Sequence, residues 1–146
     1  LQLRQGPVTR KATAVIALDT NVLVRYLVQD DAPQAQIASD VIDGLSEADQ
    51  GFVGREVLIE LVWVLERAYG FSRMEIANAL DGLLAAIELV IENADDLGLA
   101  IELYRNDGYG FADMMNAAAA RRAGARELVT FDRKAARLRG VRLLTA

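Results

Sequence analysis

Short apolar runs alternate with longer amphipathic stretches along the chain, which predicts strands alternating with helices. The apolar and β-branched runs predict strands at residues 14–18, 51–54, 89–91, 127–130 and 141–144. The longer periodic stretches predict helices at residues 21–28, 31–45, 56–69, 73–86, 94–106 and 113–123, with a helical turn at 133–138. This alternation predicts an α/β fold, a three-layer sandwich around a mainly parallel sheet in which residues 14–18 form a buried strand.

The length and composition bound the class of protein. A chain of 146 residues that is 53% hydrophobic suits one domain with a sizeable core. We expect residues 1–13 to be a flexible leader or a remnant of cloning, and residues 14–146 to form the single domain. No apolar run is long enough to span a bilayer, and no signal peptide precedes the first strand, so we expect a cytoplasmic protein.

The absence of two residue types narrows the possible chemistry. The chain has no Cys, which excludes disulfides and thiolate zinc sites. It has no His either, which removes the commonest general base and the commonest transition-metal ligand. An enzyme of this composition must rely on carboxylates, hydroxyls, amines or a hard metal ion.

Charge is unevenly distributed along the chain. The net charge is −5, yet residues 121–146 contain eight basic and only two acidic residues. Such a segment is either a solvated arginine-rich surface or an edge that faces a polyanion. The residues in it that we consider possible RNA contacts are Arg121, Arg122, Arg133 and Lys134.

Four acidic residues lie in positions that suit a site, three of them where a strand or loop meets a helix. They are Asp19, Glu60, Asp113 and Asp132. Each has an ordinary structural explanation, as a helix cap, as an acid in the first turn of a helix, or as part of a polar helix face. In parallel sheets, however, ligands bind beyond the carboxyl ends of the strands, where such acids would gather.

Carboxylates gathered in one place repel each other strongly. Two of them 4 Å apart repel by about 4 kcal/mol at an effective dielectric constant of about 20. Unless basic side chains lie beside them, they need a cation from solution, and all-oxygen ligands favour Mg²⁺ or Mn²⁺. Such ions bind phosphates and polarise an attacking water. The four acids therefore predict a metal-dependent reaction at a phosphate.

Four segments in this order resemble the PIN domain, and especially the VapC-type toxins of bacterial toxin–antitoxin pairs. They are "ALDTNVLVRYL", "VLIELVWVL", "FADMMNAAAARRAGA" and "LVTFDRKAARL", within a likeness that covers residues 14–144. The resemblance implies a five-stranded sheet of order 3-2-1-4-5. It also implies a Mg²⁺- or Mn²⁺-dependent endoribonuclease that hydrolyses RNA phosphodiesters with a metal-activated water, a homodimer, and an antitoxin that occludes the cleft.

The resemblance also implies residue roles. It makes all four acids catalytic and metal-binding, with Asp19 and Asp113 as principal ligands, Glu60 binding metal or orienting water, and Asp132 completing the site. The supporting polar residues that match the family are Thr20, Asn21 and Thr130. Helical spacing adds Asn116, which lies three residues after Asp113 on the same helix face. One departure is Gly110, where many relatives have a further acid, so the number of metal ions stays open.

Three other interpretations fit the sequence less well. A response-regulator receiver needs an acid at the end of its third strand and a late Lys, and "LVIEN" and "VRLLTA" supply neither convincingly. A HAD-type phosphatase needs a second Asp two residues after the first, where Asn21 stands. A PIN-like module that only binds protein or RNA remains the alternative to an enzyme.

Overall fold

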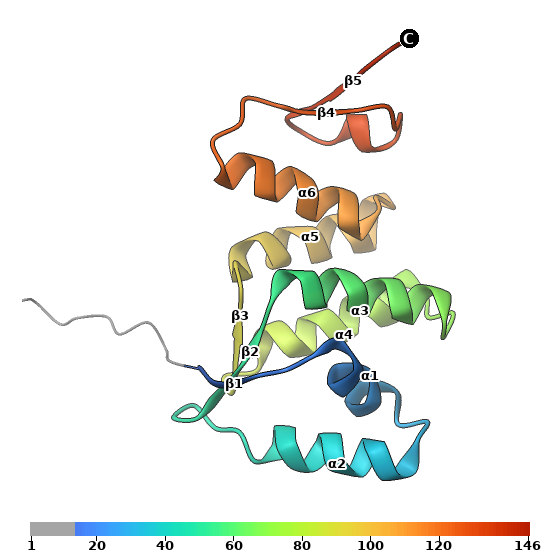
Figure 1. Cartoon of the computed structure of the whole chain (residues 1–146). Helices are drawn as coiled ribbons and strands as arrows, with labels where there is room; N and C mark the ends of the chain where they lie inside the picture. The colour runs from blue at the N-terminus through green and yellow to red at the C-terminus, as the bar shows by residue number, and fades with distance from the viewer. Residues whose placement is uncertain (1–13) are drawn as a thin grey trace, which may run out of the picture.

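The computed structural model describes residues 14–146, in which helices and strands alternate as the sequence predicts. The expected leader, residues 1–13, lies outside the described residues. The strands are β1 (Ala14–Ala17), β2 (Gln50–Val53), β3 (Leu89–Ile91), β4 (Leu128–Thr130) and β5 (Val141–Leu143). The helices are α1 (Thr20–Val28), α2 (Ala32–Asp43), α3 (Arg55–Arg67), α4 (Arg73–Ala85), α5 (Ala94–Asp107) and α6 (Phe111–Arg122), with a 3₁₀ turn at Ala135–Arg137 (Figure 1).

All strand pairs are parallel, but they form two sheets rather than one. β1, β2 and β3 pair in that order, and β4 pairs with β5 separately. Figure 1 shows β4 and β5 beyond α6, with α5 and α6 between them and β1. The parallel α/β fold is therefore confirmed. The five-stranded order and the three-layer sandwich are not.

The expectation that residues 14–18 form a buried strand is wrong for most of that range. Within the described chain β1 pairs only with β2, so its other edge is unpaired. Val15 is 61% exposed, and Ile16 and Ala17 are exposed too, whereas Leu18 at the end of the run is buried. An apolar strand at the edge of a sheet lacks the neighbour that would cover it.

Local sequence signals account for several helix boundaries. Asp31 caps α2 by accepting a hydrogen bond from the Gln34 amide, with Pro33 in the first turn. Ser72 and Glu75 form a reciprocal capping box at the start of α4. These caps satisfy amide groups that have no partner inside a helix.

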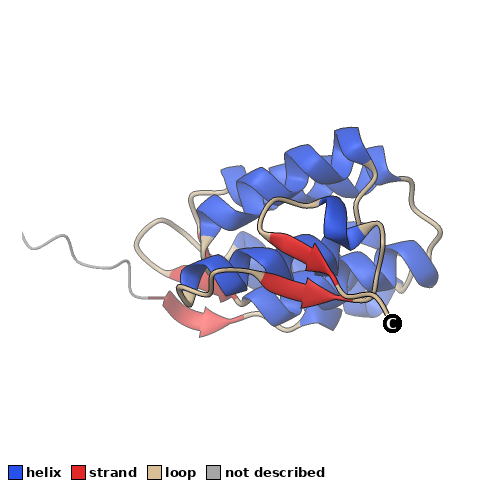
Figure 2. Ribbon diagram, turned by 90° about the horizontal axis from the view of Figure 1, so that it is seen from above, coloured by secondary structure: helices blue, strands red, loops and turns tan. Residues whose placement is uncertain are grey.

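The core lies among the helices and the strands of the first sheet. Its largest fully buried side chains come from α1, α3, α4, α5 and α6, together with β2. Contacts pair α1 with both α2 and α3, α4 with α5, and α5 with α6. Figure 2, seen from above, shows the helices in blue around the short strands in red. No helix among residues 14–146 is long and apolar enough to cross a membrane.

Candidate active site

Asp19 and Glu60 line one hollow at the surface, of about 260 Å³. Asp19 is exposed and caps α1, where its Oδ1 accepts a hydrogen bond of 2.8 Å from the Thr20 amide. Thr20 is buried, and both Thr20 and Asn21 line the hollow. Asp19 therefore has the cap role that the sequence suggests, and among residues 14–146 only its Oδ1, of the two carboxylate oxygens, accepts a hydrogen bond.

Glu60 reaches this hollow from the exposed face of α3. That face also contains Glu56 and Trp63, which line a neighbouring hollow together with Glu60. Trp63 is 56% exposed, and the Arg67 guanidinium lies 5.9 Å from the centre of its ring. The helical periodicity predicts that these residues share one face of α3. The position of that face beside Asp19 results from the packing of α1 against α3.

Asp113 and Asp132 form the second pair of acids. Asp113 lies in the first turn of α6, and burial raises the pKa of its carboxyl group. The negative charge of Asp132 raises that pKa further. A Cβ atom at Gly110 would lie 2.8 Å from Asp113 Oδ2, so glycine at 110 gives this carboxylate its space.

Asp132 is fixed by the turn that follows β4. Its Oδ1 accepts hydrogen bonds from the amides of Lys134 (2.8 Å) and Ala135 (2.9 Å). Its own amide donates to Thr130 Oγ1 at 3.0 Å, so the Thr130 hydroxyl holds the backbone that presents the acid. Asn116 is exposed on α6, one turn beyond Asp113.

The structure thus brings the four acids together as two pairs rather than as one cluster. Over residues 14–146, no group of three or more acidic side chains is arranged to bind a metal ion. One pair lies where α1 meets α3, and the other where α6 begins and β4 ends. Each pair supplies only oxygen atoms as ligands.

Comparison with known proteins identifies the architecture around these acids. The model of the PIN domain family matches residues 16–141. The chain belongs to the PIN domain family. It is also similar to a VapC ribonuclease from Aquifex aeolicus (strain VF5), with 29% identity over 117 residues, which is 80% of this chain and 87% of that protein. These matches confirm the resemblance indicated by the four sequence segments.

Two residues at the PIN domain's first acid pair escaped the sequence analysis. Arg25 and Tyr69 line the same hollow as Asp19 and Glu60. Arg25 follows Asn21 by one helical turn, a spacing that would have placed it on this side of α1. Tyr69 lies beyond the end of α3, and nothing in its local sequence indicates which helix it meets.

A third residue that the sequence analysis missed, Arg73, supports the segment before Asp113. Arg73 Nη1 donates to the carbonyls of Tyr104 (3.0 Å) and Tyr109 (2.8 Å), and Nη2 donates to the Gly108 carbonyl (2.9 Å). Its guanidinium also lies 4.2 Å from the centre of the Tyr104 ring. Gly108 has a φ of 72°, a left-handed conformation that glycine adopts without strain.

The basic segment of this PIN domain is only partly free for other contacts. Arg122 forms an ion pair of 2.5 Å with Asp96, which also pairs with Arg55. This network joins α6 to the starts of α3 and α5, so Arg122 has a structural role. Arg121, Arg133 and Lys134 are exposed.

Proposed function

We propose that this PIN domain is a metal-dependent endoribonuclease that hydrolyses RNA phosphodiesters, the toxin of a type II toxin–antitoxin system. The observation that supports it best is the pair of carboxylate sites, Asp19 with Glu60 and Asp113 with Asp132, in a chain without His or Cys. The similarity to a VapC ribonuclease supports the same reaction. The alternative is an inactive PIN-like module that only binds protein or RNA.

The chemistry of the acid pairs fits a hard divalent cation. All four side chains offer carboxylate oxygens, which suit Mg²⁺ or Mn²⁺. Burial raises the pKa of Asp113 most and the charge of Asp132 adds to it, so a cation bound there would stabilise the ionised carboxylate. When bound, such an ion would neutralise phosphate charge and lower the pKa of a water.

The chain's own residues would position the reaction. Asp19 and Asp113 would be the principal ligands, and Glu60 and Asp132 would bind the ion or orient water. Asp132 is held in place by two backbone amides and by the Thr130 hydroxyl. The Thr20 amide donates to Asp19 at the start of α1, and Asn21 lines the hollow that the substrate would enter.

Assembly of one four-acid site requires the two sheets to meet, and we propose that β4 adds to the unpaired edge of β1. Both strands expose apolar side chains: Val15 and Ile16 on β1, and Val129 on β4, with Phe131 just beyond it at 73% exposure. Pairing would cover this apolar surface and complete the order 3-2-1-4-5. It would also carry Asp132 towards Asp19.

A thiol cross-link tests this pairing, because the chain contains no Cys. We expect the double variant Val15→Cys/Val129→Cys to be bridged by a short reagent, such as dibromobimane, that becomes fluorescent only when both of its ends react. Mg²⁺ should increase the yield if the ion draws the acids together. The two single variants are controls for reaction between molecules. A double variant that gives no more fluorescence than the singles would contradict the pairing.

Cleavage of RNA by the purified chain tests the function itself. We expect internal cuts in structured RNAs with Mg²⁺ or Mn²⁺ and none with EDTA, because the acids need a cation before they can approach a phosphate. Gel electrophoresis of end-labelled RNA measures the products. Cleavage that persists undiminished in EDTA would contradict the metal requirement. RNA or protein binding without cleavage of a broad set of RNAs would favour the inactive module.

The partners follow from the same proposal. We expect a homodimer, with Ile59, Trp63 and Val64 on the exposed face of α3 as apolar contact surface, and a cognate antitoxin that blocks the acids. RNA as substrate also agrees with a cytoplasmic location. Sedimentation that detects only monomer at micromolar concentration would contradict the dimer.

A further inference from the structure

We propose that Arg25 binds the phosphate next to the reacting bond, an inference that rests on the proposed ribonuclease function. Its side chain lines the hollow that contains Asp19 and Glu60. It is the only basic residue among the described residues that line this hollow. A phosphate entering between two carboxylates meets repulsion from both, so a fixed positive charge at the same place matters for binding.

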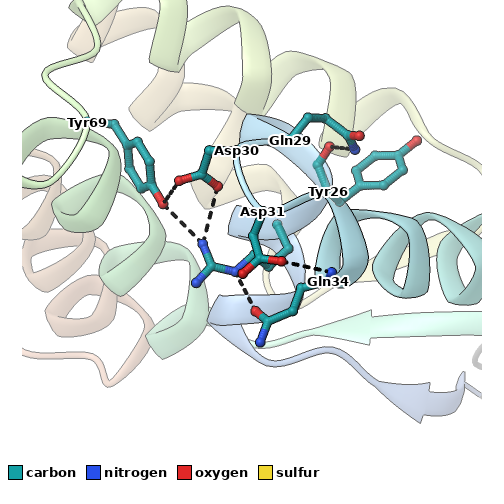
Figure 3. Close-up of polar contacts among 7 residues, drawn as sticks. Tyr26, Gln29, Asp30, Asp31, Gln34 and Tyr69 are labelled. Atoms are coloured by element: carbon teal, nitrogen blue, oxygen red, sulfur yellow. Dashed lines mark hydrogen bonds and ion pairs between the residues drawn. The ribbon is translucent and has the colours of Figure 1, made fainter.

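Arg25 is held in a defined orientation. Nε donates to Gln34 Oε1 at 2.6 Å, and Nη1 lies 3.3 Å from Asp30 Oδ1 and 3.2 Å from the Tyr69 hydroxyl. That hydroxyl donates in turn to Asp30 Oδ2 at 2.9 Å. Figure 3 shows these contacts converging on the guanidinium from α2, from the loop after α1, and from the end of α3. A side chain oriented in this way loses little further freedom when it binds a ligand.

The remaining nitrogen of the guanidinium is the one that the substrate would use. Among residues 14–146, no hydrogen bond or ion pair engages Nη2 of Arg25, and the side chain is 30% exposed. The Asp30 contact is long and partly solvated, so it neutralises Arg25 only weakly. Arginine donors are well suited to phosphate oxygens. Arg25 would therefore orient the substrate, and the acids would perform the chemistry.

RNA binding by an inactive background tests this role. A short unstructured fluorescein-labelled RNA would be titrated in Mg²⁺ against the Asp113→Asn protein with and without Arg25→Ala, and intact RNA would be verified on a gel. We expect Arg25→Ala to weaken binding about tenfold, the effect of one lost charged contact. The slope of log affinity against log salt should fall by about 0.7. Arg25→Lys keeps the positive charge but lacks the planar set of donors, so its RNA affinity should lie between those of the proteins with Arg25 and with Arg25→Ala.

Arg105→Ala is the matched control. Arg105 is also a partly exposed arginine that contacts an Asp and an amide side chain, Asp81 and Asn78, but it lies on α5 and does not line the hollow. We expect its removal to leave RNA affinity and salt slope unchanged. Thermal melts of all variants separate binding from folding.

The outcomes distinguish the two proposals. If the wild-type chain cleaves RNA while Arg25→Ala keeps full affinity and slope and loses only stability, then Arg25 merely joins α1 to α2 and α3, and the inference is wrong. If the wild-type chain neither binds nor cleaves RNA, the proposed function fails and the role of Arg25 fails with it. Weaker binding and a reduced slope for Arg25→Ala alone would support the inference.

Discussion

Replacing Asp113 by Asn should abolish RNA cleavage while leaving the metal-free protein at least as stable as the wild type. Asparagine keeps the shape of the side chain and removes one of the two charges that face each other at the second acid pair. Under the proposed mechanism this removes a principal ligand for the divalent ion, and we expect the rate to fall by at least about 100-fold, as when one strong electrostatic group is removed from an active site. Initial rates on one RNA at saturating Mg²⁺ measure this loss.

The effect on stability depends on pH, with a sign fixed by the raised pKa of Asp113. An acid whose pKa is higher in the folded state than in the unfolded state contributes its full stability at pH values below the unfolded pKa. That contribution is lost as the pH rises through the folded pKa. In EDTA, the melting temperatures of wild type and Asp113→Asn should therefore agree at acid pH and diverge towards neutral pH, with the variant higher. Added Mg²⁺ should stabilise the wild type more than the variant.

A second helix supplies the control for this prediction. Asp95 is exposed and lies in the first turn of α5, as Asp113 does in α6, but it lines neither hollow that contains Glu60. Asp95→Asn should keep full activity and the wild-type response to Mg²⁺. If Asp113→Asn instead destabilises the metal-free protein and keeps its response to Mg²⁺, then Asp113 serves its helix terminus and the proposed site is misplaced.

The helices were predictable because their signals are local. Ser72, Glu75 and Pro33 mark helix starts through hydrogen bonds and backbone restrictions within one turn. The assignment of strands was also correct, but the exposure of β1 was not, because burial depends on which strand lies alongside. An apolar run has the same sequence whether its neighbour pairs with it or lies elsewhere.

The acids of the candidate site were predictable for a similar reason, and its basic residue was not. Asp19 and Asp132 follow strands, and strand ends in a parallel sheet are where ligands bind. Arg25 follows no strand, and although its spacing from Asn21 places it on the same side of α1, its position beside Glu60 results from the packing of α1 on α3. Tyr69 and Gln34, which orient it, come from different helices or their ends. Side-chain networks between distant segments arise from tertiary packing.

Arg73→Ala should destabilise the fold by about 2–4 kcal/mol, since it removes three charge-assisted hydrogen bonds and leaves three carbonyl groups without that donor. The Tyr104 ring, fully buried, would also lose the guanidinium stacked 4.2 Å from its centre. Urea unfolding at equal protein concentration measures the change through the midpoint, provided that the slope is unchanged. Arg73→Lys should recover only part of the loss, because an ammonium group cannot donate along the same planar fork.

The same substitution should reduce activity for a reason separate from stability. The carbonyls that Arg73 binds belong to the segment from Tyr104 to Tyr109, which leads directly into α6 and Asp113. With that segment loosened, Asp113 would spend less time in position, so cleavage should fall even where the variant is fully folded. Arg105 lies on the same helix as Tyr104 and forms an ion pair near the surface. Arg105→Ala should lower the free energy of unfolding by less than about 1 kcal/mol and leave cleavage unchanged. If Arg73→Ala and Arg105→Ala have equal effects on both measurements, Arg73 contributes no more than a surface ion pair, and the position of Asp113 depends on other contacts.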